Sequence, residues 1–361
     1  MKIAIMDADL IGRKKNRFPN LVCMKLSAYH KEKGDEVTLK TDYEDLDAYD
    51  KVYVSKVFTD TPFPNEILER ENVEYGGTGF FYDKAKPLSD EIEHHMPDYH
   101  LYDDWVNNKI ANGEKRKNYE YFLDYSIGFV TRGCFRKCPF CVNQKYDQVM
   151  KHSPISEFLD KERKKICLLD DNFFGCPQWR EILDELEQTG KPYKFRQGLD
   201  ERLLTREKCQ RLFSCHYDGD FVFAFDNIKD AEVIEKNIKM AREYTDKTLR
   251  FYCFTGFDYN DRWDEEFYKQ DVIDLLKRIE ILIRYKCLPY IMRFNRYEES
   301  PYRGMYITIA RWCNQPGIFK HNTLWEFAEI SGGKDKATYK YLSSYLEDVP
   351  EAASFYEMKW R

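Results

Sequence analysis

Six short apolar runs, separated by helical patterns, constrain the fold of this chain more than any other feature. The runs cover residues 126–131, 165–172, 193–200, 221–227, 249–258 and 288–294. Apolar residues at helical spacing lie between the later runs, at 179–188, 205–213, 230–244 and 271–284. Strands that alternate with helices pair in parallel, because each helix carries the chain back across the sheet. The pattern therefore predicts an α/β structure with six parallel strands.

Polar residues or glycine close several of these runs. The candidate site residues at these ends are Asp170, Asp171, Asn172, Gln197, Asp200 and Asp226. In a parallel barrel the carboxyl ends of the strands carry the active site. We therefore expect these side chains to share one rim with the loop that follows the first strand. The alternative role for such residues, Asp226 among them, is to cap the next helix or turn.

Three of the eleven cysteines lie within eight residues and form a CxxxCxxC motif: Cys134, Cys138 and Cys141. Thiolates select zinc or iron–sulfur clusters. A structural zinc site needs four protein ligands, and the next histidine, His152, is eleven residues beyond the third cysteine. Three thiolates on a [4Fe–4S] cluster leave one iron open to a small chelating ligand. The motif therefore favours an iron–sulfur cluster over zinc.

This motif, with Phe140 directly before the third cysteine, resembles the defining motif of the radical S-adenosylmethionine (radical SAM) superfamily. The resemblance implies that the three cysteines hold a [4Fe–4S] cluster, that SAM chelates the open iron, and that Phe140 packs near the adenine. It further implies that reduction cleaves SAM to methionine and a 5′-deoxyadenosyl radical, which abstracts hydrogen from a substrate. An electron donor such as flavodoxin or ferredoxin is implied as a partner.

The stretches at 169–173 and 197–202 resemble those of radical SAM proteins that carry an N-terminal cobalamin-binding-type domain. The core fold of that superfamily is a partial (β/α)6 barrel, which the strand pattern matches. In such proteins the second strand's end approaches the methionyl part of SAM, and later ends approach its ribose and carboxylate. The resemblance thus implies a cofactor-binding role for the strand-end residues named above. The Gly-Gly-Glu that many members carry at the second strand is absent here.

The N-terminal region predicts a small Rossmann-like α/β domain. Strand patterns at 2–6, 36–40, 51–58 and 73–75 alternate with helical patterns at 20–33 and 63–71. The arrangement resembles a cobalamin-binding-type domain. A cobalamin ligand motif, Asp-x-His-x-x-Gly, would place histidine where Asp9 stands, although some members bind cobalamin without it. We therefore treat cobalamin as an alternative cofactor that the sequence does not favour.

These patterns divide the chain into four parts. The predicted parts are a Rossmann-like domain at 1–105, a polar linker at 106–124, a partial radical SAM barrel at 125–300 and a helical C-terminal extension at 301–361. In the resembled family such C-terminal segments cover the open side of the barrel and shape the substrate site.

Composition excludes several classes. Hydrophobic residues make up 43% of the chain, which is enough for a large core, and the net charge is −6. No run approaches the ~18 apolar residues that span a bilayer. The acidic Asp7 precedes any hydrophobic region of a signal peptide. We expect a cytoplasmic enzyme without a membrane partner.

The expected activity is that of a radical SAM enzyme, an oxidoreductase or a transferase, acting on a nucleoside, a peptide or a small metabolite. The cofactor carries the chemistry, so the sequence identifies no catalytic residue. One alternative is a cobalamin-dependent radical SAM methyltransferase. Another is a non-catalytic zinc or iron–sulfur module that binds RNA through basic clusters at 13–17, 115–117 and 161–165.

Overall fold

A four-stranded parallel sheet forms from the N-terminal strands. The computed structural model describes residues 1–360. The sheet has the order β2–β1–β3–β4, with β1 at Lys2–Asp7, β2 at Glu36–Lys40, β3 at Lys51–Ser55 and β4 at Val73–Gly76. The apolar residues of β1, from Ile3 to Met6, are fully buried, as a central strand with both faces covered requires. The four predicted N-terminal strands are thus present and form one parallel sheet.

Helices cover both faces of this sheet. α2 (Leu21–Glu32) begins at Asn20, whose side chain accepts hydrogen bonds from two amides of the first turn. Together with α5 (Asp103–Ala111) and α6 (Glu120–Leu123) it packs on the face of Ile3 and Ile5. The 106–124 segment, which the sequence predicts to be a polar linker, is therefore folded. Its side chains Val106, Tyr119 and Phe122 are buried in this core.

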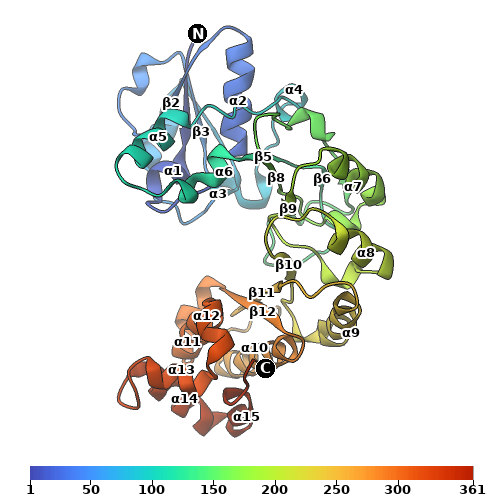
Figure 1. Cartoon of the computed structure of the whole chain (residues 1–361). Coiled ribbons are helices and arrows are strands. Elements are labelled where there is room, and N and C mark those ends of the chain that lie inside the picture. Colours follow the sequence, from blue (N-terminus) through green and yellow to red (C-terminus); the bar gives the residue numbers. More distant parts are fainter. Residues whose placement is uncertain (361) are drawn as a thin grey trace. The chain divides into compact units, whose positions relative to one another are not determined.

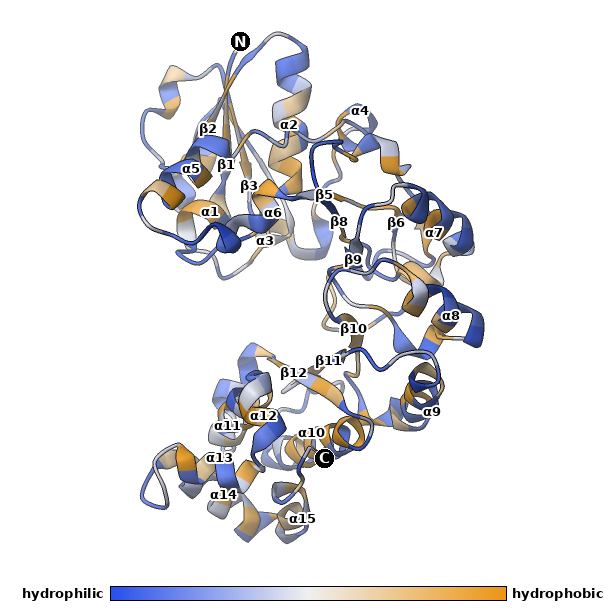
Figure 2. Ribbon diagram, in the orientation of Figure 1, coloured by the Kyte–Doolittle hydropathy of each residue, from blue (hydrophilic) through white to orange (hydrophobic). Residues whose placement is uncertain are grey.

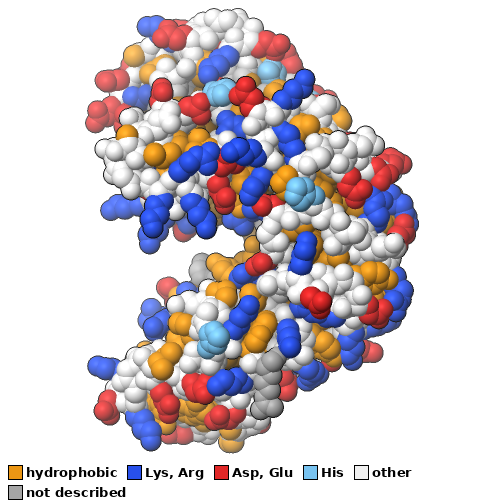
Figure 3. All heavy atoms as spheres, viewed as in Figure 1, with side chains coloured by type: hydrophobic (Ala, Val, Ile, Leu, Met, Phe, Trp, Pro, Cys, Tyr) orange, Lys and Arg blue, Asp and Glu red, His pale blue; other side chains and the backbone are white. Residues whose placement is uncertain are grey.

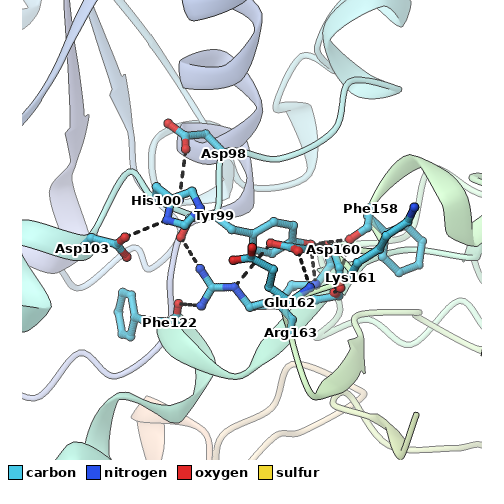
Figure 4. Close-up of polar contacts among 12 residues, drawn as sticks. Asp98, Tyr99, His100, Asp103, Phe122, Phe158, Asp160, Lys161, Glu162 and Arg163 are labelled. Atoms are coloured by element: carbon cyan, nitrogen blue, oxygen red, sulfur yellow. Dashed lines mark hydrogen bonds and ion pairs between the residues drawn. The ribbon is translucent and has the colours of Figure 1, made fainter. Parts of the chain in front are cut away.

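A buried arginine ties the segment after α4 (Asp90–Glu93) to the next sheet (Figure 4). The guanidinium of Arg163 donates to the carbonyl oxygens of Tyr99 and Phe122, each at 2.6 Å. The Tyr99 hydroxyl donates to the Phe158 carbonyl at 2.6 Å and accepts from the Ile127 amide at 2.8 Å. Arg163 is only 6% exposed. It thus belongs to the interior, although the sequence places it in a basic cluster.

All six predicted strands after residue 124 are present (Figure 1). One sheet has the order β5–β8–β9, with strands at Tyr125–Gly128, Lys165–Leu168 and Tyr193–Phe195. A second has the order β10–β11–β12, with strands at Phe221–Ala224, Leu249–Thr255 and Cys287–Arg293. The β5–β8, β10–β11 and β11–β12 pairs are parallel. Closure of the six strands into one partial barrel remains a prediction.

Helices follow the later strands as the sequence predicts. They are α7 (Trp179–Gln188), α8 (Arg206–Ser214), α9 (Ala231–Arg242) and α10 (Glu265–Arg284). In Figure 2 hydrophobic and hydrophilic residues alternate along the helices, as expected for helices with one buried face. α10 begins earlier than the predicted residue 271, because Asp264 caps it and Phe267 and Tyr268 are buried in its first turns.

Five helices form the C-terminal segment: α11 (Arg303–Cys313), α12 (Pro316–His321), α13 (Leu324–Ile330), α14 (Ala337–Asp348) and α15 (Ala353–Tyr356). Their aromatic residues Trp312, Tyr345 and Tyr356 are fully buried. Across residues 1–360 we find no helix with the length and apolar character needed to cross a membrane.

The chain divides into two units. The first contains residues 1–171 and 175–194, and the second contains 172–174 and the chain from Phe195 onward. Each unit contains a mixture of helices and parallel strands. The boundaries of the four predicted parts of the chain stay predictions.

Candidate functional site

The three motif cysteines lie on one loop in the first unit. This cysteine loop, residues 133–149, connects β6 (Thr131–Arg132) to β7 (Met150–Lys151), which pair as an antiparallel hairpin after β5. The loop begins at Gly133, whose φ is +96°. A Cβ at this position would lie 2.4 Å from the carbonyl oxygen of Gln148. Glycine is therefore required both by the backbone conformation and by the close approach of the two ends of the loop.

Two consecutive carboxylates after β8 hold the cysteine loop. Asp170 accepts hydrogen bonds from the amide and the hydroxyl of Thr131, at 2.6 and 2.5 Å. Asp171 accepts from the Gly133 amide at 3.0 Å and from the side-chain amide of Asn143 at 2.6 Å. Burial raises the pKa of Asp170 to about 7 and raises that of Asp171 as well. The structure thus assigns both carboxylates a structural contact to the loop, and their predicted contact with a cofactor stays a prediction.

Hydrogen bonds within the cysteine loop fix its shape further. The Cys141 amide donates to the Cys138 carbonyl at 2.9 Å, which closes a turn around the last two cysteines. The side-chain amide of Gln144 donates to the Pro139 carbonyl at 2.8 Å. The ammonium of Lys137 donates to the Gln144 carbonyl at 2.7 Å. These contacts within the loop add to the hydrogen bonds that Asp171 accepts from Gly133 and Asn143.

Backbone amides point at two of the three sulfur atoms. The Arg136 amide donates to Sγ of Cys134 at 3.3 Å, and the Asn143 amide donates to Sγ of Cys141 at 3.4 Å. All three cysteines are half-buried. Amides that donate to sulfur stabilise the thiolate form and tune iron–sulfur clusters. Among residues 1–360, no three His, Cys, Asp or Glu side chains are grouped as ligands of one metal ion.

Phe140 lies on this loop and contacts the N-terminal part of the chain through its carbonyl oxygen. The Phe140 carbonyl accepts a hydrogen bond from the Tyr82 hydroxyl at 3.1 Å. Tyr82 follows α3 (Thr78–Phe81) in the N-terminal part of the same unit. The contact links the loop to the segment that follows α3. Sequence reasoning missed this link, because Tyr82 lies outside every motif.

A charged network lies at the base of the loop. Oε1 of Glu93 lies 3.1 Å from the Lys25 ammonium and 3.6 Å from both Arg132 and His152. Although burial raises the pKa of Glu93, the charges of Lys25 and Arg132 lower it on balance. Burial, with Arg132, lowers the pKa of His152. Arg132 also stacks over the Phe129 ring at 3.5 Å. The base of the hairpin is thus joined to α2 and α4.

Four of the predicted site residues belong to the second unit. Asp200 accepts from the amide and Nε of Arg202, at 3.3 and 2.8 Å. Asp226 accepts from the Phe254 amide at 2.9 Å, and burial raises its pKa. Gln197 is exposed, and Asn172 is buried. Asp200 thus caps a turn, as the alternative interpretation allows, and Asp226 supports the end of the neighbouring strand β11.

Two buried charges at the ends of β10 and β11 were missed by sequence reasoning. Arg278 donates to the carbonyl oxygens of Phe225 and Phe254, at 2.8 and 2.9 Å. Asp271 accepts from the Thr255 hydroxyl and the Gly256 amide, each at 2.7 Å. Both lie on α10. Asp271 is four residues before the buried Leu275 and Arg278 is three residues after it, so both share its face of the helix. A charge on the apolar face of a helix was the signal in the sequence.

Three arginines of the basic clusters that suggest RNA binding form ion pairs within the chain. Arg13 pairs with Asp60 at 2.7 Å, Arg17 with Glu114 at 2.8 Å, and Arg116 with Asp124 at 2.8 Å. Figure 3 shows acidic and basic side chains side by side over much of the visible surface. Each of these three arginines is thus partly neutralised by a carboxylate of the same chain.

Comparison with known proteins identifies solved structures whose fold is similar to that of this chain. No family model matches the sequence, and no curated protein matches it. TsrM from Kitasatospora setae, a radical SAM methyltransferase solved with cobalamin and a [4Fe–4S] cluster bound, has a TM-score of 0.52 at 11% identity. The match covers 81% of this chain and 72% of TsrM. OxsB, a cobalamin-dependent SAM radical enzyme solved with aqua-cobalamin and SAM, has a TM-score of 0.46 at 14% identity. That match covers 97% of this chain and 61% of OxsB. The likeness to TsrM confirms the resemblance to radical SAM proteins as one of fold.

Proposed function

We propose that the chain is a radical SAM enzyme in which Cys134, Cys138 and Cys141 hold a [4Fe–4S] cluster. When bound, the cluster binds SAM at its open iron and supplies the electron that cleaves it to methionine and the 5′-deoxyadenosyl radical, which abstracts hydrogen from the substrate. The observation that carries the proposal is the cysteine loop itself. It presents three thiols, of which Cys134 and Cys141 accept backbone hydrogen bonds, and it is fixed by the buried carboxylate of Asp170 and the half-buried carboxylate of Asp171. The fold likeness to TsrM supports the same reading.

The chain's own residues then have defined tasks. Asp170 and Asp171 keep the spacing of the cysteine loop, because they bind its first residues and its middle. The positive charges of Arg132 and Arg136 offset the negative charge that thiolates bring to a cluster. Phe140, on the same loop, is the residue that we propose packs against the adenine ring of SAM. A flavodoxin or ferredoxin is the proposed electron donor, and the substrate is a nucleoside, a peptide or a small metabolite.

The first test is anaerobic. The full chain is reconstituted with iron and sulfide, dithionite and SAM are added, and 5′-deoxyadenosine is measured by chromatography. Wild type should produce it and Cys138→Ala should not. Cys176→Ser is the matched control, because Cys176 is buried outside the loop and the hydroxyl can keep its 3.3 Å hydrogen bond to Gln178. The control should keep the wild-type rate.

Two outcomes would contradict the proposal. One is a Cys138→Ala protein with a full complement of iron and an unchanged rate. The other is a protein that takes up zinc instead of iron and cleaves no SAM, which would favour the non-catalytic metal-binding module.

A second candidate is a cobalamin-dependent methyltransferase, favoured by the likeness to TsrM, which was solved with cobalamin bound. The sequence-based expectation that cobalamin is disfavoured is not supported by this likeness. Asp9 accepts hydrogen bonds from the Val57 and Phe58 amides, at 2.6 and 3.4 Å, and from the Thr61 hydroxyl. Its carboxylate is thus occupied, so cobalamin would bind without a ligand from this position. Retention of hydroxocobalamin after gel filtration, read from its visible spectrum, tests this candidate.

A further inference from the structure

We propose that the second unit contains a binding site for a nucleoside polyphosphate, in a pocket with a volume of about 350 Å³. The lining residues that carry the argument are Arg242, Lys247, Tyr285, Lys286, Lys320 and Trp360. Ligand sites of this kind occupy roughly 300–1,000 Å³. The site is independent of the proposed SAM chemistry, so it stands or falls on its own test.

The pocket concentrates positive charge in a chain whose net charge is −6. Of its five cationic residues, only Arg284 forms an ion pair, with Glu235 at 2.9 Å. Arg242, Lys247, Lys286 and Lys320 have no carboxylate within ion-pair distance in the part of the chain that the structure describes. Asp246 is the single acidic residue that lines the pocket. An anion is the ligand that this unbalanced charge would attract.

Arg242 builds the pocket without being able to donate to a ligand. Its guanidinium donates to the carbonyl oxygens of Tyr285, Thr245, Lys247 and Lys286, at 3.0, 3.3, 2.8 and 2.6 Å. Its remaining donor faces Sγ of Cys287 at 3.6 Å. All five N–H groups of a guanidinium are then used. Arg242 therefore fixes the two loops that carry Lys247 and Lys286, and it leaves its positive charge in the pocket.

The backbone at Lys286 ends helix α10 at the edge of the pocket. Its φ is +52°, in the left-handed region. A residue other than glycine or asparagine in that region is uncommon and costs free energy. The side chain of Lys286 is exposed and makes no ion pair among residues 1–360. This left-handed conformation ends the helix, because Lys286 follows the C-cap Tyr285 and its amide donates to the Ile283 carbonyl at 3.1 Å.

An aromatic wall completes the site. The ammonium of Lys320 lies 5.4 Å from the centre of the Trp360 ring. Phe319 packs edge-on against the same indole, with ring centres 5.8 Å apart. A planar base can stack on an indole whose position is fixed in this way, while the lysines bind the phosphates. This combination favours a nucleotide over a bare phosphate.

The pocket lies away from the strand ends that would carry the radical reaction. Most of its residues end α9 and α10 or come directly before β11 and β12 (Figure 1), while Lys320 lies in α12 and Trp360 follows α15. They therefore surround the amino ends of these strands, whereas active sites of parallel barrels lie at the carboxyl ends.

Isothermal titration of the full chain with ATP, pyrophosphate and adenosine, at low and high salt, tests the site. ATP and pyrophosphate should bind, and high salt should weaken both. The double variant Lys247→Gln with Lys286→Gln should weaken both by about tenfold or more. The matched control, Lys115→Gln with Lys117→Gln, removes the same charge from exposed lysines of the first unit and should bind as wild type does. Circular dichroism verifies that the variants are folded.

The variant Trp360→Ala distinguishes a nucleotide ligand from an inorganic polyphosphate. It should weaken ATP and leave pyrophosphate unchanged; if it weakens neither, the site takes inorganic polyphosphate, and the assignment to a nucleotide is overturned. The site itself is overturned if neither ATP nor pyrophosphate binds, or if the control pair loses as much affinity as the pocket pair.

Discussion

Asn143 and Asp171 lie 28 residues apart in the chain, yet the side-chain amide of Asn143 donates a 2.6 Å hydrogen bond to Oδ1 of Asp171. The other carboxylate oxygen accepts from the Gly133 amide. One side chain after β8 therefore joins the start of the cysteine loop to its middle. The geometry of the three thiols depends on this carboxylate, although it is not a proposed ligand of the cluster.

Replacement of this carboxylate should weaken cluster binding. Asp171→Ala removes two hydrogen bonds to a charged acceptor, each worth about 1.5–3 kcal/mol. We expect the reconstituted variant to hold less iron and to cleave SAM at least about tenfold more slowly. Iron analysis and the 5′-deoxyadenosine assay measure this. Asp104→Ala, at an exposed position of α5, is the control. Equal iron content and rate in Asp171→Ala and wild type would contradict the role of Asp171.

A methyl group at the start of the cysteine loop should weaken cluster binding as much as the loss of the Asp171 carboxylate does. Gly133→Ala must place a Cβ 2.4 Å from the Gln148 carbonyl, at a φ of +96°. Gly113→Ala is a matched control, because Gly113 has a φ of +92° and its Cβ would have no atom within 4 Å. In both variants an alanine must adopt the left-handed backbone conformation, which costs about 1–2 kcal/mol. Only Gly133→Ala adds a steric clash. Iron retention should fall in Gly133→Ala alone. A similar loss in both variants would attribute the effect to the backbone conformation.

Loss of the buried guanidinium should destabilise the first unit. Arg163→Met leaves the carbonyl oxygens of Tyr99 and Phe122 without their 2.6 Å donors. Unsatisfied buried groups cost about 1–3 kcal/mol each. Urea denaturation should therefore show a loss of about 2–5 kcal/mol in the free energy of unfolding. Lys161→Met changes an exposed side chain of the same loop and should be neutral. Equal stability of the two variants would refute the role of Arg163.

Glu201 should make stability fall as the pH rises. Its side chain is 1% exposed, and neither carboxylate oxygen has a hydrogen-bond partner among residues 1–360. Burial, with the charge of Asp200, raises its pKa from 4.5 to about 9. The folded state thus keeps a proton that the unfolded chain releases above pH 4.5, so this contribution to stability is lost between pH 4.5 and 9.

The size of that loss is measurable. Relative to Glu201→Met, wild type should lose up to about 1.4 kcal/mol for each pH unit within this window. Urea denaturation at pH 6, 7.5 and 9 gives the difference between the two proteins. A difference that does not change with pH would show that Glu201 is ionised in the folded state.

The strands could be predicted from the sequence because each is a buried apolar run that polar residues or glycine close. The first turns of α10 could not, since Glu265, Glu266 and Lys269 make them polar although Phe267 and Tyr268 are buried. Propensity and periodicity describe single segments. They do not show which polar residues will be covered by another part of the chain.

The same limit applies to the site. The sequence places Asp170 and Asp171 at a strand end beside the cysteine loop, which the structure supports. It does not reveal their partners, because Thr131 and Asn143 meet them only after the loop has folded back. Arg278 and Asp271 carried a readable signal, a charge on an apolar helix face. No feature of the sequence indicated the hydrogen bond between Tyr82 and the Phe140 carbonyl.

The contacts of Asp9 also restrict how this chain can change over evolution. Its carboxylate receives two amides and one hydroxyl from the segment after β3, and the side chain is only 2% exposed. An imidazole at position 9 would leave those donors unsatisfied and would not fit the same space. A lineage could therefore exchange this aspartate for histidine only if Thr61 and its neighbours changed with it. Position 9 is thus coupled to the 57–61 segment through these hydrogen bonds.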